Sequence, residues 1–281
     1  MTPVVRTCRL SLLAISIASA CFAHAEDVSS IERIEVNKQR QAYRGEFSYL
    51  QSPEAVTEFN SELIAQAGIT GLTQVLDMSA SVSRQNSLGG LWDSFAIRGF
   101  FGDENVPSGY LVNGFNAGRG FSGPRDVSGI ESIEVLKGPK AALFGRGEPG
   151  GSINIITKKP TFASSTQLSV TAGSRQHQRL EADINTTFSN DTAARLIGFY
   201  QTEDSFRETI ETQKHGMSAA FQFDQSANST WTYDLEYAEQ EIPFDRGIIT
   251  PNGNFDFLPI ERFLGEPSDG PTSTSVHVHQ L

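Results

Sequence analysis

The feature that most constrains the fold is an alternation of apolar and polar residues that begins near Gln167 and continues toward the C-terminus. A period of two residues belongs to a β-strand whose two faces meet different surroundings. A strand needs about 9–11 residues to cross a membrane. The pattern therefore predicts antiparallel transmembrane strands, with apolar residues facing lipid and polar residues, carboxylates included, solvated in a wet interior. The predicted strands are residues 167–172, 179–188, 193–202, 217–224 and 231–238, of which the third is the least regular.

The connections between these strands favour the same arrangement. In order, they run to about 5 residues (173–177), 3 (189–191), 10 (203–212), 4 (225–228) and about 30 (242–271). Shorter turns thus alternate with longer loops, a pattern typical of outer-membrane barrels with short turns at one end and long loops at the other. A soluble β-sandwich would also alternate, with its apolar faces forming a core, so it is the alternative on this pattern alone.

A second constraint is the stretch Glu131–Pro160, in which two short strands flank a glycine-rich run at 145–151. The run contains a literal G-x-G-x-x-G. A dinucleotide site requires that motif to open a helix, but here Pro149 interrupts it and a β-branched strand, residues 152–157, follows. We therefore interpret the glycines as allowing backbone to pack closely against backbone.

This stretch resembles the end of the plug domain of TonB-dependent outer-membrane receptors. Those families carry a similar E-x-x-E-V-L-K/R-G-P…L-Y/F-G-x-x-x-P-G-G-x-I-N-x-x-T-K-x-P, and this chain matches nearly every fixed position. Further matches lie at Trp92–Phe100 and Tyr110–Gly114, so the resemblance covers roughly Ile31–Pro271 and leans toward ferric-siderophore receptors. It implies an α+β plug domain at residues 44–160, followed at 161–281 by the first strands of a barrel of about 22 strands.

Within the predicted plug, local patterns indicate several short elements. Strands are expected at 55–59, 81–84 and 95–98, and short helices at 60–68 and 70–78. The dipeptide Asn113-Gly114 predicts a hairpin turn. Two glycine-rich segments, 87–92 with Trp92 and 117–123 with Arg119 and Phe121, are expected to be exposed tips.

The N-terminus predicts export. Residues 1–25 have a basic start, an apolar middle and the cleavage pattern Ala23-His24-Ala25, which together indicate a signal peptide; a lipoprotein anchored at Cys21 is the poorer alternative. Residues 26–43 then form a polar tail. The resemblance implies a TonB box there, a segment that pairs with TonB as an added strand; its predicted residues are Ile34, Glu35 and Val36.

The resemblance also implies two sets of functional residues. Arg98 and Lys137 are similar to family basic residues that latch the plug by pairing with barrel carboxylates, here expected beyond residue 281. Ligand contacts are expected on the loop tips, where aromatic rings offer flat apolar contact and arginine suits anionic chelate oxygens; the alternative is that they are ordinary tips touching solvent or the barrel wall. The predicted ligand-contact residues are Arg84, Trp92, Asp103, Glu104, Arg119 and Phe121, with Phe244, Asp245 and Arg246 as weaker candidates.

Composition narrows the function further. A net charge of −11 argues against nucleic acid, and no catalytic or metal-ligand arrangement stands out, the pair His277 and His279 being too few ligands. We therefore expect neither an enzyme nor a cofactor.

The resemblance implies a ferric-siderophore receptor in the outer membrane of a Gram-negative bacterium, its plug and N-terminus facing the periplasm. Its implied partners are TonB with its inner-membrane energising complex, the ferric siderophore and outer-membrane lipid. Cobalamin, haem or a glycan as ligand, or a soluble periplasmic plug-like binding protein, are the alternatives.

Five strands and part of a sixth cannot enclose a plug of this size, because plugged transporters use about 22 strands. An open sheet edge in lipid would also leave backbone groups unpaired. The chain stops at His277–Leu281, in mid-strand. We therefore expect it to be the N-terminal fragment of a longer receptor, an incomplete portion of a plugged barrel that cannot transport alone.

Overall fold

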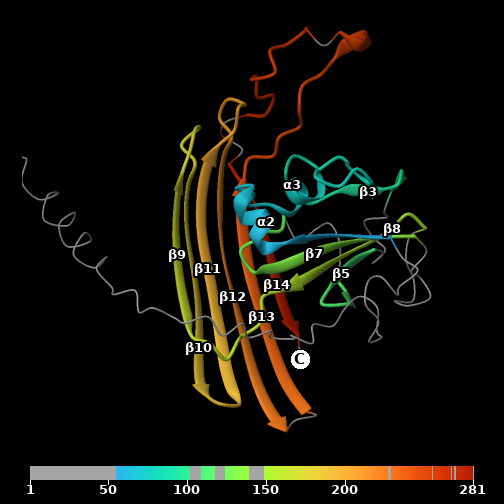
Figure 1. Ribbon diagram of the computed structural model, residues 1–281. Helices are drawn as coiled ribbons and strands as arrows, with labels where there is room; N and C mark the ends of the chain where they lie inside the picture. Colours follow the sequence, from blue (N-terminus) through green and yellow to red (C-terminus); the bar gives the residue numbers. More distant parts are fainter. Residues whose placement is uncertain are drawn as a thin grey trace, which may run out of the picture. The chain divides into compact units, whose positions relative to one another are not determined.

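The computed structural model describes residues 55–101, 109–117, 124–138, 149–226, 229–254, 256–266, 268 and 270–280. The predicted signal peptide and TonB box lie outside these residues. Two groups of elements follow one another along the described chain (Figure 1). We call the first, the described residues between 55 and 160, the α+β region, and the second, strands β9 to β14, the six-stranded sheet.

The α+β region contains two sheets and the two short helices that the sequence predicts. Strand pairing follows the order β1-β7-β8-β5-β6 in one sheet and β2-β3-β4 in the other, and β5 and β8 pair in parallel. The strands of the first sheet are β1 (Ala55–Asn60), β5 (Tyr110–Val112), β6 (Phe115–Asn116), β7 (Ile130–Lys137) and β8 (Gly151–Thr157). The strands of the second sheet are β2 (Val82–Arg84), β3 (Phe95–Ile97) and β4 (Phe100–Phe101). The helices are α2 (Ser61–Gln66) and α3 (Leu72–Leu76).

Local chemistry explains these elements. The side chain of Asn60 caps α2 by accepting a hydrogen bond of 2.9 Å from the backbone N–H of Leu63. The predicted hairpin turn is confirmed, since Asn113 and Gly114 adopt φ values of 51° and 79° between β5 and β6. Ile133 of β7, and Ile153 and Ile155 of β8, are buried in the core together with Leu72 and Val75 of α3.

The six-stranded sheet is antiparallel throughout, in the order β14-β13-β12-β11-β10-β9. Among the described residues, β9 and β14 are its two edges. Figure 1 shows the six strands side by side, with the loop of residues 243–271 at one end. The strands are β9 (Ser165–Ala172), β10 (Gln178–Ser189), β11 (Thr192–Asp204), β12 (Glu211–Ser226), β13 (Ser229–Ile242) and β14 (Thr272–Gln280).

The predicted separation of apolar and polar faces is confirmed. Large apolar side chains on one face are exposed, among them Val170 (77%) and Phe188 (67%). The other face, which we call the inner face, carries buried polar side chains such as Arg179, Asp183 and Gln201. Strand β11 is less regular because its inner face also holds apolar residues, including the buried Ile197. None of the helices in the described residues is long and apolar enough to cross a membrane.

Because neighbouring strands run antiparallel, the connections 173–177, 205–210 and 243–271 all lie at one end of the sheet. We call this the loop end and the last connection the long loop. The long loop contains the short 3-10 turn Pro251–Gly253.

Candidate functional site

The α+β region contacts the inner face through buried ion pairs, and the segment 124–129 supplies two of the residues. Hydrogen bonds between the backbones of Leu72 and Arg125 (2.9 Å) and of Val127 and Thr70 (3.2 Å) hold this segment against the start of α3. Gly129 then comes so close to the sheet that a Cβ there would lie 3.0 Å from the hydroxyl of Ser218. The segment is therefore fixed where its side chains reach the inner face.

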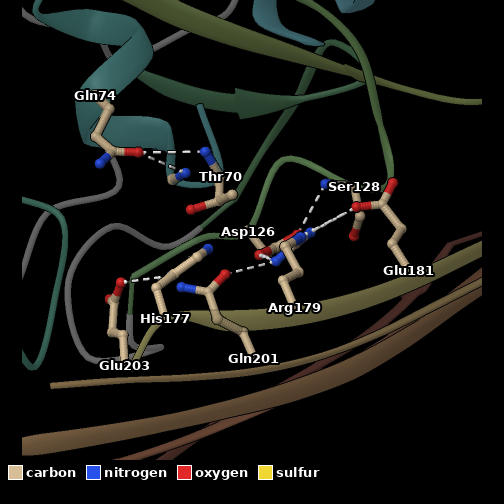
Figure 2. A network of polar contacts seen from close by, with 10 residues as sticks. Thr70, Gln74, Asp126, Ser128, His177, Arg179, Glu181, Gln201 and Glu203 are labelled. Carbon is tan, nitrogen blue, oxygen red and sulfur yellow. Dashed lines mark hydrogen bonds and ion pairs between the residues drawn. The ribbon is translucent and has the colours of Figure 1, made fainter. Parts of the chain in front are cut away.

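Arg179 on β10 is the most extensively bonded of these residues (Figure 2). Its two terminal nitrogens donate to the two carboxylate oxygens of Asp126 at 2.8 and 2.9 Å. They also donate to Gln201 at 2.9 Å and to Glu181 at 2.7 Å. The guanidinium lies 4.8 Å from the ring centroid of Phe199. Only 5% of the Arg179 side chain and 8% of the Asp126 side chain are exposed, so the pair is buried.

Arg125, the neighbour of Asp126, forms a second bridge by pairing with Glu236 on β13. Its backbone N–H donates to Asp93 at 2.7 Å, and Thr73 donates to the same carboxylate. Burial raises the pKa of Asp93 against these hydrogen bonds. Burial alone would lower the pKa of Arg125, but the carboxylate of Glu236 and the hydroxyl of Tyr110 outweigh it, and the pKa is raised. Arg125 thus stays charged and joins α3, the loop before β3 and the sheet.

The end of the α+β region contributes two lysines. Lys158 pairs with Asp183 at 3.1 Å, and Arg195 approaches the same carboxylate at 2.8 Å. Lys159 pairs with Asp234 on β13. The prediction that the strand carboxylates are solvated is therefore wrong for Asp183, Asp234 and Glu236. They lie on the inner face, where buried carboxylates need cationic partners. The basic pair Lys158-Lys159, next to the first strand of the sheet, is the sequence feature that could have indicated these ion pairs.

The predicted latch residues occupy different positions from these pairs. Arg98 is exposed in a left-handed conformation (φ 54°) directly after β3, and Lys137 is half-buried at the end of β7. Among the described residues neither has an ion-pair partner, and the latch role of both stays a prediction.

Two of the predicted ligand-contact residues are described. Arg84 pairs with Asp77, and its Nε donates to that carboxylate at 2.8 Å, with 55% of the Arg84 side chain exposed. Trp92 is 7% exposed, and its ring N–H donates to the carbonyl of Asn86 at 3.1 Å. The expected exposure of Trp92 is therefore wrong, because the ring packs inward and supports the loop. The remaining four, Asp103, Glu104, Arg119 and Phe121, lie outside the described residues, as do Ile34, Glu35 and Val36.

A pocket of about 490 Å³ lies at the loop end, between the loop 86–90 of the α+β region and the sheet. We call it the loop-end pocket. The two sides meet closely: the side chain of Gln240 donates to the carbonyl of Gly90 at 2.9 Å. A Cβ on Gly89 (φ 70°) would lie 2.8 Å from the Phe244 ring and 2.9 Å from the backbone of Asp245. The polar residues that line the pocket include Asn86, Ser87, Arg175, Glu203, Asp204, Ser205, Asp245 and Arg246, so two of the weaker candidates, Asp245 and Arg246, lie at this site.

Arg207, in the connection 205–210, holds the long loop at two places. Its Nε donates to Asp245 at 2.8 Å, and its Nη1 donates to the backbone carbonyls of Ile260 at 2.6 Å and Arg262 at 3.2 Å. Only 10% of the Arg207 side chain is exposed. No sequence pattern marked this residue, since its partners lie far along the chain.

We expect R207Q to free the long loop, because the three bonds of the guanidinium stabilise it by roughly 1–3 kcal/mol. Chymotrypsin should then cleave after the exposed Phe257 about tenfold faster than in the wild-type chain. R262Q is the control: Arg262 is 61% exposed and pairs with Glu208 at only 3.7 Å, so cleavage should not change. Equal cleavage of R207Q and wild type would show that Arg207 does not hold the loop.

Histidines and carboxylates form no cluster of three or more able to hold a metal ion in the part of the chain that the structure describes. His177 instead lies 3.2 Å from Glu203 at the rim of the pocket.

Comparisons with known proteins give a consistent result. Residues 49–152 match the family model of the TonB-dependent Receptor Plug Domain. The chain is 30% identical over 242 residues to the metal-pseudopaline receptor CntO of Pseudomonas aeruginosa, a match that covers 85% of this chain and 34% of that protein. The siderophore receptor PiuA of Acinetobacter baumannii superposes with a TM-score of 0.64 at 26% identity, over 70% of this chain and 28% of PiuA. FpvA of P. aeruginosa superposes with a TM-score of 0.72 at 20% identity, over 85% and 32%, and shows the fold alone. The chain thus spans about a third of the length of the first curated relatives it matches.

Proposed function

We propose that this chain, which belongs to the family of TonB-dependent receptors, supplies the plug and the first wall strands of an outer-membrane receptor that takes up ferric siderophores. The observation that carries the proposal is the inner face of the sheet. Its carboxylates pair with cations of the α+β region, while large apolar side chains on the opposite face are exposed. A sheet with a polar plug on one side and an apolar outer surface suits the wall of a plugged membrane barrel.

The ligand would bind at the loop end. There the loop 86–90 of the plug, the end of β11 and the start of the long loop meet around one pocket. A ligand bound there would contact plug and wall together, so a movement of the plug would change its contacts. The family consists of transport receptors, and we assign no catalytic role.

Metal chelates are the ligand class that the relatives favour. One is a metal-pseudopaline receptor, and others are catecholate siderophore and ferripyoverdine receptors. Because the name of the first receptor refers to a metal and does not specify iron, a chelate of another transition metal is the second candidate ligand. In either case the chelate would hold the metal itself, and the protein would contact the organic groups.

We place the periplasmic partner on the N-terminal tail. Ile34, Glu35 and Val36 would pair with the periplasmic domain of TonB as an added strand, facing the periplasm together with the plug. An added strand requires free backbone N–H groups, which proline lacks. The chain, expressed with its N-terminal segment and extracted from membranes in detergent, should therefore bind purified TonB periplasmic domain.

The variant I34P should lose at least tenfold in TonB affinity, as measured by isothermal titration calorimetry. S29P, a proline in the same tail before the predicted segment, is the control and should bind as wild type does. If wild type does not bind, or if I34P binds as tightly as wild type, the proposed TonB segment is wrong. Recovery of the chain only in the soluble periplasmic fraction would instead favour a plug-like binding protein.

A further inference from the structure

Each carboxylate of the loop-end pocket has a polar partner, but only Asp245 is paired with an arginine. Asp245 accepts from Arg207 at 2.8 Å, and Asp204 accepts from the side chain of Gln176 at 2.6 Å. The carboxylate of Glu203 lies 3.2 Å from the ring nitrogen of His177. Each of these acids is therefore held by a hydrogen bond or an ion pair.

The two arginines of the pocket differ from the acids. Among the described residues, neither Arg175 nor Arg246 has an ion-pair partner, and both are exposed. Arg246 lies with its guanidinium 5.7 Å from the ring centroid of Phe244, a contact that leaves the N–H edge of the guanidinium open. The other arginines of the loop end, Arg207 and Arg262, are already paired. The pocket thus presents two available guanidinium groups.

The backbone holds Arg175 in place. Arg175 and Gln176 form the centre of a turn between β9 and β10, with φ values of 54° and 53°, a conformation that usually selects asparagine and glycine. The backbone N–H of His177 closes the turn by donating to the carbonyl of Ser174 at 3.2 Å. The backbone N–H of Asp204 donates to the carbonyl of Arg175 at 2.8 Å. Arg175 is therefore fixed at the pocket wall by contacts that do not involve its side chain.

The opposite wall of the pocket, formed by the start of the long loop, fixes the position of Arg246. Arg246 follows Asp245, which Arg207 holds, and the backbone of Asp245 lies against Gly89. A side chain at Gly89 would clash with that backbone, so glycine keeps the plug loop flush with the long loop. Because the chain as a whole carries a net charge of −11, an anion in this pocket would depend on these two guanidinium groups for attraction.

We propose that Arg175 and Arg246 form an anion clamp in the loop-end pocket that selects a metal chelate with several anionic oxygens over a neutral chelate of the same shape. This inference rests on the proposed function and adds to it the charge of the ligand and the two residues that read it. Planar guanidinium groups bind pairs of anionic oxygens through parallel N–H bonds. Arg84, which Asp77 neutralises, is not part of the clamp.

The test uses two synthetic chelates that enclose iron in six oxygens but differ in charge. A tripodal ferric tris-catecholate is triply anionic, since three doubly charged catecholates surround Fe³⁺, whereas a ferric tris-hydroxamate is neutral. Binding to the full 281-residue chain in detergent is measured by isothermal titration calorimetry. We expect the wild-type chain to bind the anionic chelate at least tenfold more tightly than the neutral one, with an affinity that falls as salt is raised.

The double variant R175Q/R246Q should lose at least tenfold in affinity for the anionic chelate and keep the affinity of wild type for the neutral one. R262Q, which removes an arginine of the same loop outside the pocket, should bind both as wild type does. Unchanged far-UV circular dichroism and thermal midpoint of the double variant would exclude a folding defect. The clamp is overturned if wild type does not prefer the anionic chelate or binds neither, or if the double variant binds as wild type does. The TonB titration judges the proposed function separately, because its residues lie in the N-terminal tail.

Discussion

R179Q is expected to lower the free energy of unfolding by about 3–5 kcal/mol, the range for removing one partner of a buried ion pair. Glutamine keeps much of the side-chain length but cannot neutralise Asp126, which would remain buried with a negative charge. Glu181, 2.7 Å from the Arg179 side chain in the wild type, would also lose its cation. The measurement is denaturant unfolding in detergent, combined with hydrogen exchange of segment 124–130, which should lose protection first.

R84Q is the matched control for that prediction. It also breaks an arginine–aspartate pair, but Arg84 and Asp77 are 55% and 43% exposed, and exposed pairs contribute less than about 1 kcal/mol. The double variant R179Q/D126N should be less destabilised than R179Q alone, because it removes part of the uncompensated charge. If R179Q and R84Q have similar effects, the contact between Arg179 and Asp126 does not fasten the α+β region to the sheet.

The face of each strand could be predicted from the sequence, but the partners across the interface could not. Alternation fixes that Asp183 and Ile184 point to opposite faces, because the period of a strand is two. It does not say that Asp183 meets Lys158, since that depends on where the α+β region lies on the inner face. For the same reason the sequence predicts solvated carboxylates on the strands, whereas Asp183, Asp234 and Glu236 are paired with cations in the fold.

The loop end shows a second limit of sequence reasoning. Trp92 stands in a glycine-rich segment typical of exposed tips, yet its ring is buried and bonded to Asn86, because a tip needs its own support. Arg175 was missed because a five-residue turn carries no motif. Its signal is the left-handed backbone of Arg175 and Gln176, which becomes visible only in three dimensions.

G150A is expected to destabilise the α+β region by at least about 3 kcal/mol, near the upper end for single substitutions. A Cβ on Gly150 would lie 2.1 Å from the backbone carbonyl oxygen of Ile97. That oxygen cannot turn aside as a flexible side chain could, so β3 and β8 would have to separate. G151A should be at least as severe, because Gly151 has a φ of 144° and its Cβ would lie 2.2 Å from the carbonyl oxygen of Leu136.

G114A separates this clash from backbone strain. Gly114 has a φ of 79°, but a Cβ there would meet no atom within 4 Å, so alanine should cost only the left-handed penalty of about 1–2 kcal/mol. Denaturant unfolding should therefore rank wild type above G114A, and G114A above G150A. If G150A were as stable as wild type, close packing would not explain the two glycines. If the ranking holds, the last glycine of the G-x-G-x-x-G pattern has a structural role: it allows the strand that follows, β8, to lie against β3 of the second sheet.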